Sequence, residues 1–214
     1  MHLLRLILAL LMALPLSACA LSGGSVSGRV LEEGTGKPLT GAIVVVRWIG
    51  HTTSGSIYVE ARDVCYHVET ATTDERGAYQ TKAWSQEQHK DYTVKFDHML
   101  VDTYQRDYGF PQTPSQKDGI VYLAPFKGAG GERLKYLERM LDATRCGSQN
   151  DTERNLHALY YTMYEEAKSI AVSKEDAEIV DTLRYWASFV IFDKNKPMTR
   201  DAKGRLINVD PKGK

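Results

Sequence analysis

The chain has no surplus of either charge, because 27 Lys and Arg side chains are balanced by 27 Asp and Glu side chains among its 214 residues. A neutral chain lacks the strong positive field that attracts nucleic acids and the strong negative field that attracts basic partners. The composition therefore favours neither a nucleic-acid-binding protein nor a protein that acts on a highly charged surface.

Motifs that carry catalysis are also missing. The sequence contains no His-Glu-x-x-His or His-x-x-Glu zinc pair and no Gly-x-Ser-x-Gly nucleophile elbow. The glycine-rich run over residues 128–131 is followed by no Lys-Ser pair, so it predicts a flexible hinge rather than a phosphate-binding loop. We expect a protein that is not an enzyme and that carries no cofactor.

Long hydrophobic runs are absent, with one short exception near the start. Residues 6–14 are uniformly apolar, follow Arg5 and precede Pro15. A helix that spans a bilayer needs about 20 apolar residues, so this run is too short for a permanent span. A basic start, a short apolar stretch and small residues after it are typical of a secretory signal peptide.

The end of this segment reads Leu16-Ser17-Ala18-Cys19 and resembles the lipobox of bacterial lipoproteins. The resemblance implies that residues 1–18 are removed and that Cys19 carries a diacylglyceryl thioether and further acyl chains such as palmitate. Ala20, rather than Asp, implies an outer-membrane destination and a periplasmic location. Residues 19–24 would then form a tether of about 15 Å. The alternative is an ordinary signal peptide cleaved near Ala18 or Ala20.

Cysteine is scarce, with three residues in the whole chain. If Cys19 is lipidated, Cys65 and Cys146 remain as a pair in an oxidising compartment. We expect a Cys65–Cys146 disulfide, and closing a loop of about 80 residues would stabilise the fold by roughly 4 kcal/mol. The alternative is two buried free thiols.

Strand patterns dominate the chain up to residue 125. The predicted strands cover residues 25–31, 42–48, 66–73, 78–84, 92–96 and 120–123. The run over 42–48 has consecutive β-branched residues at its centre, over 43–46, which indicates a strand covered on both faces or lying in a sandwich core. About seven short strands at this spacing predict an antiparallel β-sandwich.

Three motifs in this half resemble the carboxypeptidase regulatory-like family. They read V-S-G-R-V-L over 26–31, G-K-P-L-T-G-A-I-V-V over 36–45 and T-D-E-R-G-A-Y over 73–79. The resemblance implies a transthyretin-like β-sandwich over residues 25–125 that accompanies catalytic domains without holding their zinc. The chain departs from short family members by an insertion over 49–64, which is either a binding loop or a longer connection.

After residue 131 the apolar period changes to 3.6, which predicts three helices over 131–193 and an α+β fold. Asn150 and Ser173 are the expected N-caps of the second and third helices. The expected apolar stripes are Leu134, Leu137, Leu141 and Thr144; Leu156, Leu159, Tyr160, Met163, Tyr164, Ala167 and Ile170; and Ile179, Val180, Leu183, Trp186, Ala187, Val190 and Ile191. Residues 194–214 are polar and Lys-rich, and we expect them to be largely disordered.

Candidate binding residues are few. His67 and Glu69 share one strand face, and we interpret them as a surface pair, because a metal site would need a further ligand. His51, His89 and His98 offer no metal-ligand spacing. A transthyretin-like hydrolase is also disfavoured, since the chain lacks the terminal Tyr-Arg-Gly-Ser of those enzymes. Off the helical stripes, Tyr161 and Tyr185 are the better candidates for a contact surface.

The sequence therefore predicts a non-catalytic, lipid-anchored protein on the periplasmic face of the outer membrane. Its partners would be the membrane, through the lipid, and another envelope protein. Two alternatives remain open: a periplasmic protein that binds a metal or a small molecule, and an enzyme of unrecognised type. A cleft with convergent polar side chains, located between the strands and the helices, would favour a binding site.

Overall fold

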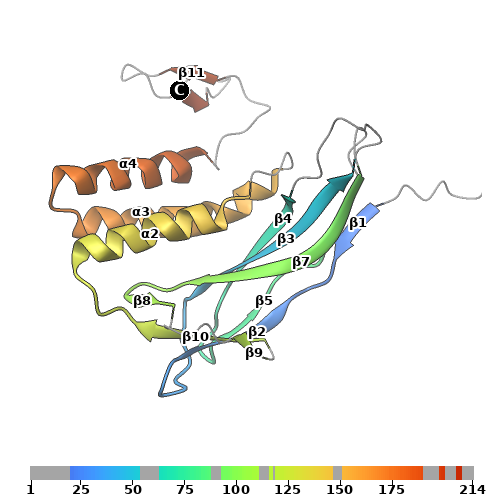
Figure 1. Ribbon diagram of the computed structural model, residues 1–214, viewed down its shortest axis with the longest axis horizontal. Coiled ribbons are helices and arrows are strands. Elements are labelled where there is room, and N and C mark those ends of the chain that lie inside the picture. The colour runs from blue at the N-terminus through green and yellow to red at the C-terminus, as the bar shows by residue number, and fades with distance from the viewer. Residues whose placement is uncertain are drawn as a thin grey trace, which may run out of the picture.

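The computed structural model describes residues 20–53, 63–87, 93–110, 116–117, 119–146, 151–189, 198–200 and 206–208. The chain has an α+β fold with several antiparallel or mixed sheets followed by three helices (Figure 1). The helices lie against one end of the strands and run along the long axis of the molecule. Cys19 and the predicted signal peptide lie outside the described residues.

A three-stranded antiparallel sheet forms the middle of the molecule. Its central strand β3 (Ile43–Thr53) pairs with β4 (Asp63–Thr72) on one side and with β7 (Thr93–Tyr104) on the other. The flanks of the expected 49–64 insertion belong to β3 and β4, while residues 54–62 lie outside the described residues. The insertion thus lengthens a hairpin.

A second sheet orders its strands β5-β2-β10-β8 and carries β9 beside β10. The bounds are β2 Ser27–Glu32, β5 Ala78–Gln80, β8 Tyr108–Gly109, β9 Gln116–Lys117 and β10 Ile120–Pro125. Strand β10 runs parallel to β2, so this sheet is mixed rather than purely antiparallel as expected. A separate pair joins β1 (Ala20–Gly23) to β6 (Trp84–Glu87).

The described residues before the helices contain ten strands, compared with the expected seven. One reason is that the predicted strand over 78–84 is divided into β5 and β6. At the interruption the hydroxyl of Thr81 accepts the N–H of Val26 at 2.9 Å, and Ser25 Oγ donates to the Thr81 carbonyl at 2.7 Å. These side-chain hydrogen bonds supplement the backbone bond from the Thr81 N–H to the Val26 carbonyl at 2.8 Å, where the chain passes from one sheet to the next.

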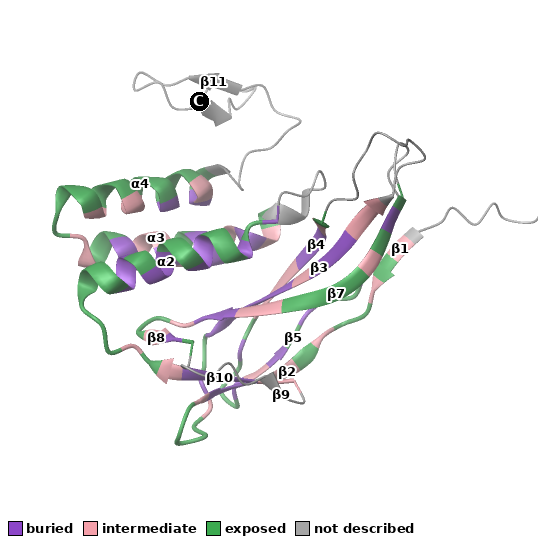
Figure 2. Ribbon diagram, viewed as in Figure 1, coloured by how far each residue is buried: buried purple, intermediate pink, exposed green. Residues whose placement is uncertain are grey.

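Strand β3 supplies side chains to two cores. Ile43 and Val45 are buried with the helices, whereas Val44, Val46 and Trp48 are buried between the two sheets (Figure 2). Alternate residues of a strand point to opposite faces. A strand covered on both sides is therefore mostly apolar, which explains the run over residues 43–46. The next residue, Arg47, is the exception, and it pairs with Asp102 at 2.8 Å.

The helical layer consists of α2 (Gly130–Thr144), a 3-10 turn η1 (Asp151–Leu156), α3 (His157–Ile170) and α4 (Lys174–Phe189). The expected stripe of α2 is confirmed, since Leu134, Leu137, Leu141 and Thr144 are all buried. Among the described helices, none is both long and apolar enough to cross a bilayer.

The expected cap of α4 is present. Ser173 Oγ accepts the N–H of Asp176 at 3.1 Å, and the Asp176 carboxylate accepts the N–H of Ser173 at 2.9 Å in return. Backbone N–H groups hydrogen-bonded to this carboxylate lower the pKa of Asp176. The other expected cap, Asn150, lies outside the described residues.

The motif over residues 73–79 forms a tight turn, and its glycine has the backbone conformation that such a turn needs. Gly77 has φ of 70°, and a Cβ there would lie 2.5 Å from the carbonyl oxygen of Val30. Both the left-handed backbone and the close approach exclude other residues. Asp74 Oδ1 accepts the N–H groups of Ala78 and Arg76, each at 2.9 Å, and these bonds lower the pKa of Asp74.

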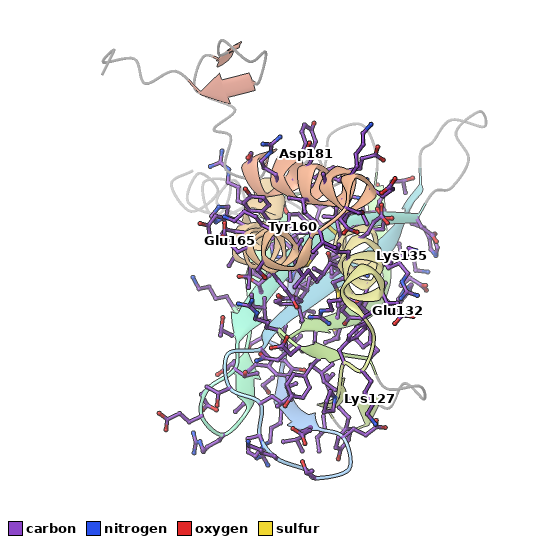
Figure 3. The ribbon with its side chains drawn as sticks, turned by 90° about the vertical axis from the view of Figure 1, so that its left-hand side faces the viewer. Lys127, Glu132, Lys135, Tyr160, Glu165 and Asp181 are labelled. Atoms are coloured by element: carbon purple, nitrogen blue, oxygen red, sulfur yellow. A yellow bond between two sulfur atoms is a disulfide. The ribbon has the colours of Figure 1, made fainter. Side chains whose placement is uncertain are left out.

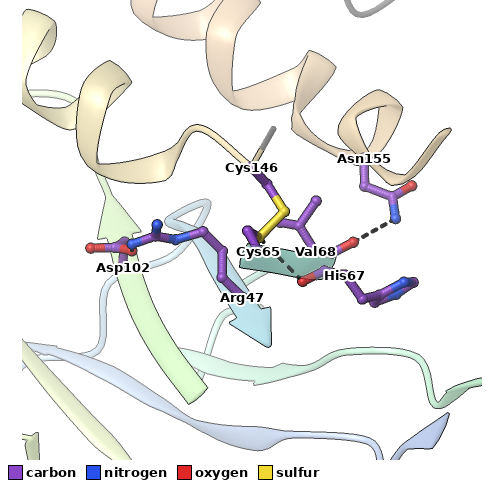
Figure 4. The surroundings of a disulfide bond; sticks show 7 residues. All are labelled: Arg47, Cys65, His67, Val68, Asp102, Cys146 and Asn155. Atoms are coloured by element: carbon purple, nitrogen blue, oxygen red, sulfur yellow. Dashed lines mark hydrogen bonds and ion pairs between the residues drawn. A yellow bond between two sulfur atoms is a disulfide. The ribbon is translucent and has the colours of Figure 1, made fainter. Parts of the chain in front are cut away.

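A disulfide pair links the central sheet to the helical layer (Figure 4). Cys65 lies near the start of β4 and Cys146 follows the end of α2, with 5.0 Å between their Cα atoms. Asn155 of η1 strengthens the same contact, because its amide donates to the Val68 carbonyl at 2.9 Å. The end of α2 and the turn after it are thereby attached to one edge of the sheet.

Two short strands lie within the region expected to be largely disordered. Strand β11 (Met198–Arg200) pairs antiparallel with β12 (Leu206–Asn208). The remainder of residues 194–214 lies outside the described residues.

Candidate binding site between the helices and the strands

A buried charged network connects α2, α3 and the end of β7. Arg133 is 4% exposed and Glu166 is 3% exposed. The Arg133 guanidinium donates two hydrogen bonds to the Glu166 carboxylate, from Nε to Oε1 at 2.9 Å and from Nη2 to Oε2 at 3.0 Å. Tyr104 of β7 donates its hydroxyl to Glu166 Oε2 at 2.6 Å. Every oxygen of this buried carboxylate therefore has a donor, which a buried charge requires.

The rest of the guanidinium holds the turn between β7 and β8. Its Nη2 donates to the Gln105 carbonyl at 3.1 Å, and its Nη1 donates to the Tyr108 carbonyl. The rings of Tyr136 and Phe126 lie 4.7 and 5.1 Å from its central carbon. Burial and the neighbouring Glu166 carboxylate both raise the pKa of Tyr104, so its hydroxyl keeps its proton. We name Arg133, Glu166 and Tyr104 the interlayer clamp.

A cavity of about 410 Å³ opens beside the interlayer clamp, between β8 and α2. Its lining residues are Gly109, Phe110, Phe126, Tyr136, Arg139, Met140 and Ala143. Three aromatic rings form most of the wall: Tyr136 lies 6.1 Å from Phe110 and 5.8 Å from Phe126 between ring centroids. Phe110 is exposed although it is a large apolar side chain. An open apolar wall of this kind is typical of a ligand site.

One cation lines the cavity. Arg139 forms no ion pair within the described part of the chain, and its Nε donates to the carbonyl of Lys135, one turn earlier, at 3.4 Å. Burial raises the pKa of Tyr136 to about 12, so this wall residue is neutral at physiological pH. The site thus combines aromatic surface with one positive charge that has no acidic partner within the described residues.

The outer side of α2 extends this site into a shallow polar hollow. The hollow is lined by Phe126, Gly128, Glu132, Lys135, Glu138 and Arg139. Figure 3 shows Glu132 and Lys135 on the outer side of α2, whereas Tyr160 lies among the helices. Charges of both signs alternate here, so the apolar cavity is the more selective part of the surface.

His67 and Glu69 lie in a different place from the one expected. His67 is 6% exposed and stacks on Trp84 at 4.1 Å, so the interpretation as a surface pair was wrong. Its Nε2 lies 2.9 Å from Glu69 Oε1, and Asn155 Nδ2 donates to the same oxygen at 3.3 Å. The sequence could not show this burial, because the covering Trp84 is supplied by another strand.

The protonation state of His67 follows from these contacts. A carboxylate only accepts, so Nε2 carries the proton, and the buried Nδ1 has no hydrogen-bond partner. Burial is the largest influence and lowers the pKa of His67, so the ring is neutral. We interpret His67 as a part of the core between the sheets.

Two further histidines, His51 and His98, form a small polar group at the far end of the central sheet. His51 contacts Asp63 at 2.6 Å and Asp97 at 3.7 Å, and His98 contacts the same Asp97 at 2.8 Å. The hydrogen bond with His98 lowers the pKa of Asp97. Among the residues that the structure describes, no group of three or more His, Cys, Asp or Glu side chains has the arrangement of a metal site. His89 lies outside them.

Tyr161 and Tyr185, predicted to lie off the helical stripes, are both exposed. The residues that sequence reasoning missed are Arg133, Arg139 and Phe110. Arg133 is one residue before Leu134 and three before Tyr136, so helical spacing places it on the buried face. A charged residue on an apolar face was the available signal for the interlayer clamp.

Comparison with known proteins adds no assignment: no family model, no curated protein and no solved structure matches this chain.

Proposed function

We propose that this chain is a non-catalytic lipoprotein, anchored to the periplasmic face of the outer membrane through Cys19, that binds a small apolar anion. The anchor is supported by the lipobox-like Leu16-Ser17-Ala18-Cys19 and the short apolar run before it. The Cys65–Cys146 pair supports an oxidising compartment, since structural disulfides are rare in reducing ones.

The binding module in this proposal is a transthyretin-like β-sandwich. Its support is the core shared by the two sheets, in which Val44 and Val46 of β3 pack with Val30 of β2 and Leu123 of β10. The three sequence motifs over residues 26–79 are further support. The helical layer covers the other face of the central sheet, a feature outside the family resemblance.

The cavity beside the interlayer clamp is the observation that carries the binding function. A ligand that matches it has an aromatic or branched apolar body for Phe110, Phe126 and Tyr136 and one anionic group for Arg139. The proposal thus favours the small-molecule alternative among those that the sequence left open. A metal has no comparable support in the described residues.

Lipidation is tested by growing cells with radioactive palmitate and isolating the protein. We expect label in the natural chain and none in Cys19→Ala, which would accumulate in its unprocessed form. Equal labelling of the two chains, or none in either, would contradict the anchor.

Ligand binding is tested by titrating the purified protein with anilinonaphthalene sulfonate, an aromatic sulfonate that fluoresces in apolar sites. We expect one saturable site that weakens about tenfold in Arg139→Gln, the equivalent of losing about 1.4 kcal/mol from one charged contact. Arg184→Gln is the matched control, because Arg184 is an exposed arginine of α4 paired with Asp181. If Arg139→Gln binds the probe as tightly as Arg184→Gln does, the probe binds elsewhere and the proposed ligand site is wrong.

A further inference from the structure

The residues that directly follow Cys19 form part of the folded domain. Strand β1 begins at Ala20, where the sequence alone suggested a tether over residues 19–24. It pairs antiparallel with β6, with Ala20 opposite Glu87 and Gly23 opposite Trp84. Since neighbouring Cα atoms lie about 3.8 Å apart, a lipid carried by Cys19 would be attached one residue from this strand pair.

Close packing fixes β1 at its inner end. A Cβ on Gly23 would lie 2.2 Å from the indole nitrogen of Trp84 and 2.9 Å from that of Trp48. Both tryptophans are buried in the core between the sheets, and Leu21 packs against the same core. The path from Cys19 into the core is therefore only a few residues long.

The outer end of β1 coincides with one end of the central sheet. Strand β6 runs outward to Glu87, and β7 starts back at Thr93, opposite Thr53 at the end of β3. Strand β4 starts at the same end, with Asp63 opposite His51. Figure 1 shows β1 and these strand ends on one side of the molecule and the turn between α3 and α4 on the other.

We propose that this end of the sheet faces the lipid surface and that the cavity is held away from it. The inference rests on the proposed lipid anchor at Cys19. Strand β7 has 12 residues and crosses the molecule from the lipid-facing end to the interlayer clamp at Tyr104. At about 3.3 Å per residue this is a distance of about 36 Å.

The opposite end is formed by the turn between α3 and α4. Ser169 accepts a hydrogen bond from Arg106, two residues beyond β7, and Val172 in the turn is 95% exposed. The cavity lies on this side, because Gly109, which ends β8, and Phe110, which follows it, both line the cavity. The orientation therefore presents the binding site to the periplasm and its soluble ligands.

The orientation is tested with two variants of the full lipidated protein that each add one free cysteine, Lys95→Cys near the lipid-facing end and Val172→Cys at the opposite end. Each carries a fluorophore and is reconstituted in vesicles of phosphatidylethanolamine and phosphatidylglycerol that contain a spin-labelled headgroup lipid. We expect loss of emission at position 95 and unchanged emission at position 172. Equal quenching at both positions, or stronger quenching at 172, would overturn the inference.

A linker variant tests whether the pairing of β1 sets the orientation. A flexible Gly-Ser linker inserted between Cys19 and Ala20 keeps the acyl anchor and removes the constraint from β1. We expect it to abolish the difference between the two positions, and a difference that persists would refute the role of β1. Flotation with vesicles separates the two proposals: protein that fails to float contradicts the anchor, whereas floating protein with equal quenching contradicts the orientation alone.

Discussion

Removing both charges of the interlayer clamp is expected to cost less stability than the two single neutralisations cost when they are added together. In Glu166→Gln, one of the two oxygens that face Arg133 and Tyr104 becomes an amide donor, so a guanidinium that is 4% exposed loses its counter-charge. An unpaired buried charge destabilises a fold by about 3–5 kcal/mol. Arg133→Met leaves the Glu166 carboxylate unpaired at a similar cost.

The double variant Arg133→Met/Glu166→Leu removes both charges. The Tyr104 hydroxyl then loses its acceptor, and the carbonyls of Gln105 and Tyr108, which belong to partly exposed residues, lose the guanidinium donor. We therefore expect the double variant to be more stable than the sum of the single changes predicts, by about 3 kcal/mol.

The assay is urea unfolding followed by tryptophan fluorescence, because Trp48 and Trp84 report on the strands and Trp186 on the helices. The exposed pair Arg184–Asp181 provides a matched control cycle, with an expected coupling below about 0.5 kcal/mol. The reasoning would be refuted if the losses in unfolding free energy of the single variants simply added in the double variant. It would also be refuted if each single change cost under about 1 kcal/mol.

Three further predictions concern stability. Replacing Cys65 and Cys146 by Ser, which opens a loop with a sequence separation of 81, should cost about 4–5 kcal/mol in chemical unfolding; a loss below about 1 kcal/mol would contradict the chain-entropy estimate. Because the folded pKa of Tyr136 is raised to about 12, the unfolded chain ionises first and stability should fall by about 2–3 kcal/mol between pH 10 and 12. Tyr136→Phe should lack this part of the decline, as alkaline unfolding curves of the two proteins would show. Because the folded pKa of His67 is lowered, the unfolded chain binds more protons and stability should fall as the pH drops below about 6.5. His67→Gln should decline less steeply in the same acid titration, and an identical slope would remove His67 as the cause.

Patterns that depend on a residue's own segment were readable from the sequence. The β-branched run of β3, the apolar stripe of α2 and the Ser173 cap each follow from spacing within a few positions. The seam between the strands and the helices, where a binding site was sought, holds the cavity beside Tyr136.

Features that depend on distant partners were not readable. Strand β1 has four residues and pairs with β6, which follows more than 60 positions later, so Leu21 alone gave no strand pattern. His67 was expected at the surface because the ring of Trp84 that covers it comes from another strand. Charged residues are ordinarily exposed, and Arg133 departs from that rule only because Glu166 and two carbonyls meet it in the fold.

Helix α2 is attached to the rest of the fold near both ends, by an ion pair at its start and by a disulfide after its end. Arg133 in its first turns attaches it to β7 and α3, and Cys146 beyond its last turn attaches it to β4. Arg133 and Cys146 are 13 positions apart, a distance of about 20 Å at 1.5 Å per residue, well beyond the range at which substitutions couple. Removing the disulfide and neutralising Glu166 should therefore have additive effects, together about 8 kcal/mol. Since domains are stable by about 5–15 kcal/mol, either change alone is expected to leave the chain folded, whereas the combination takes a typical domain to the edge of unfolding.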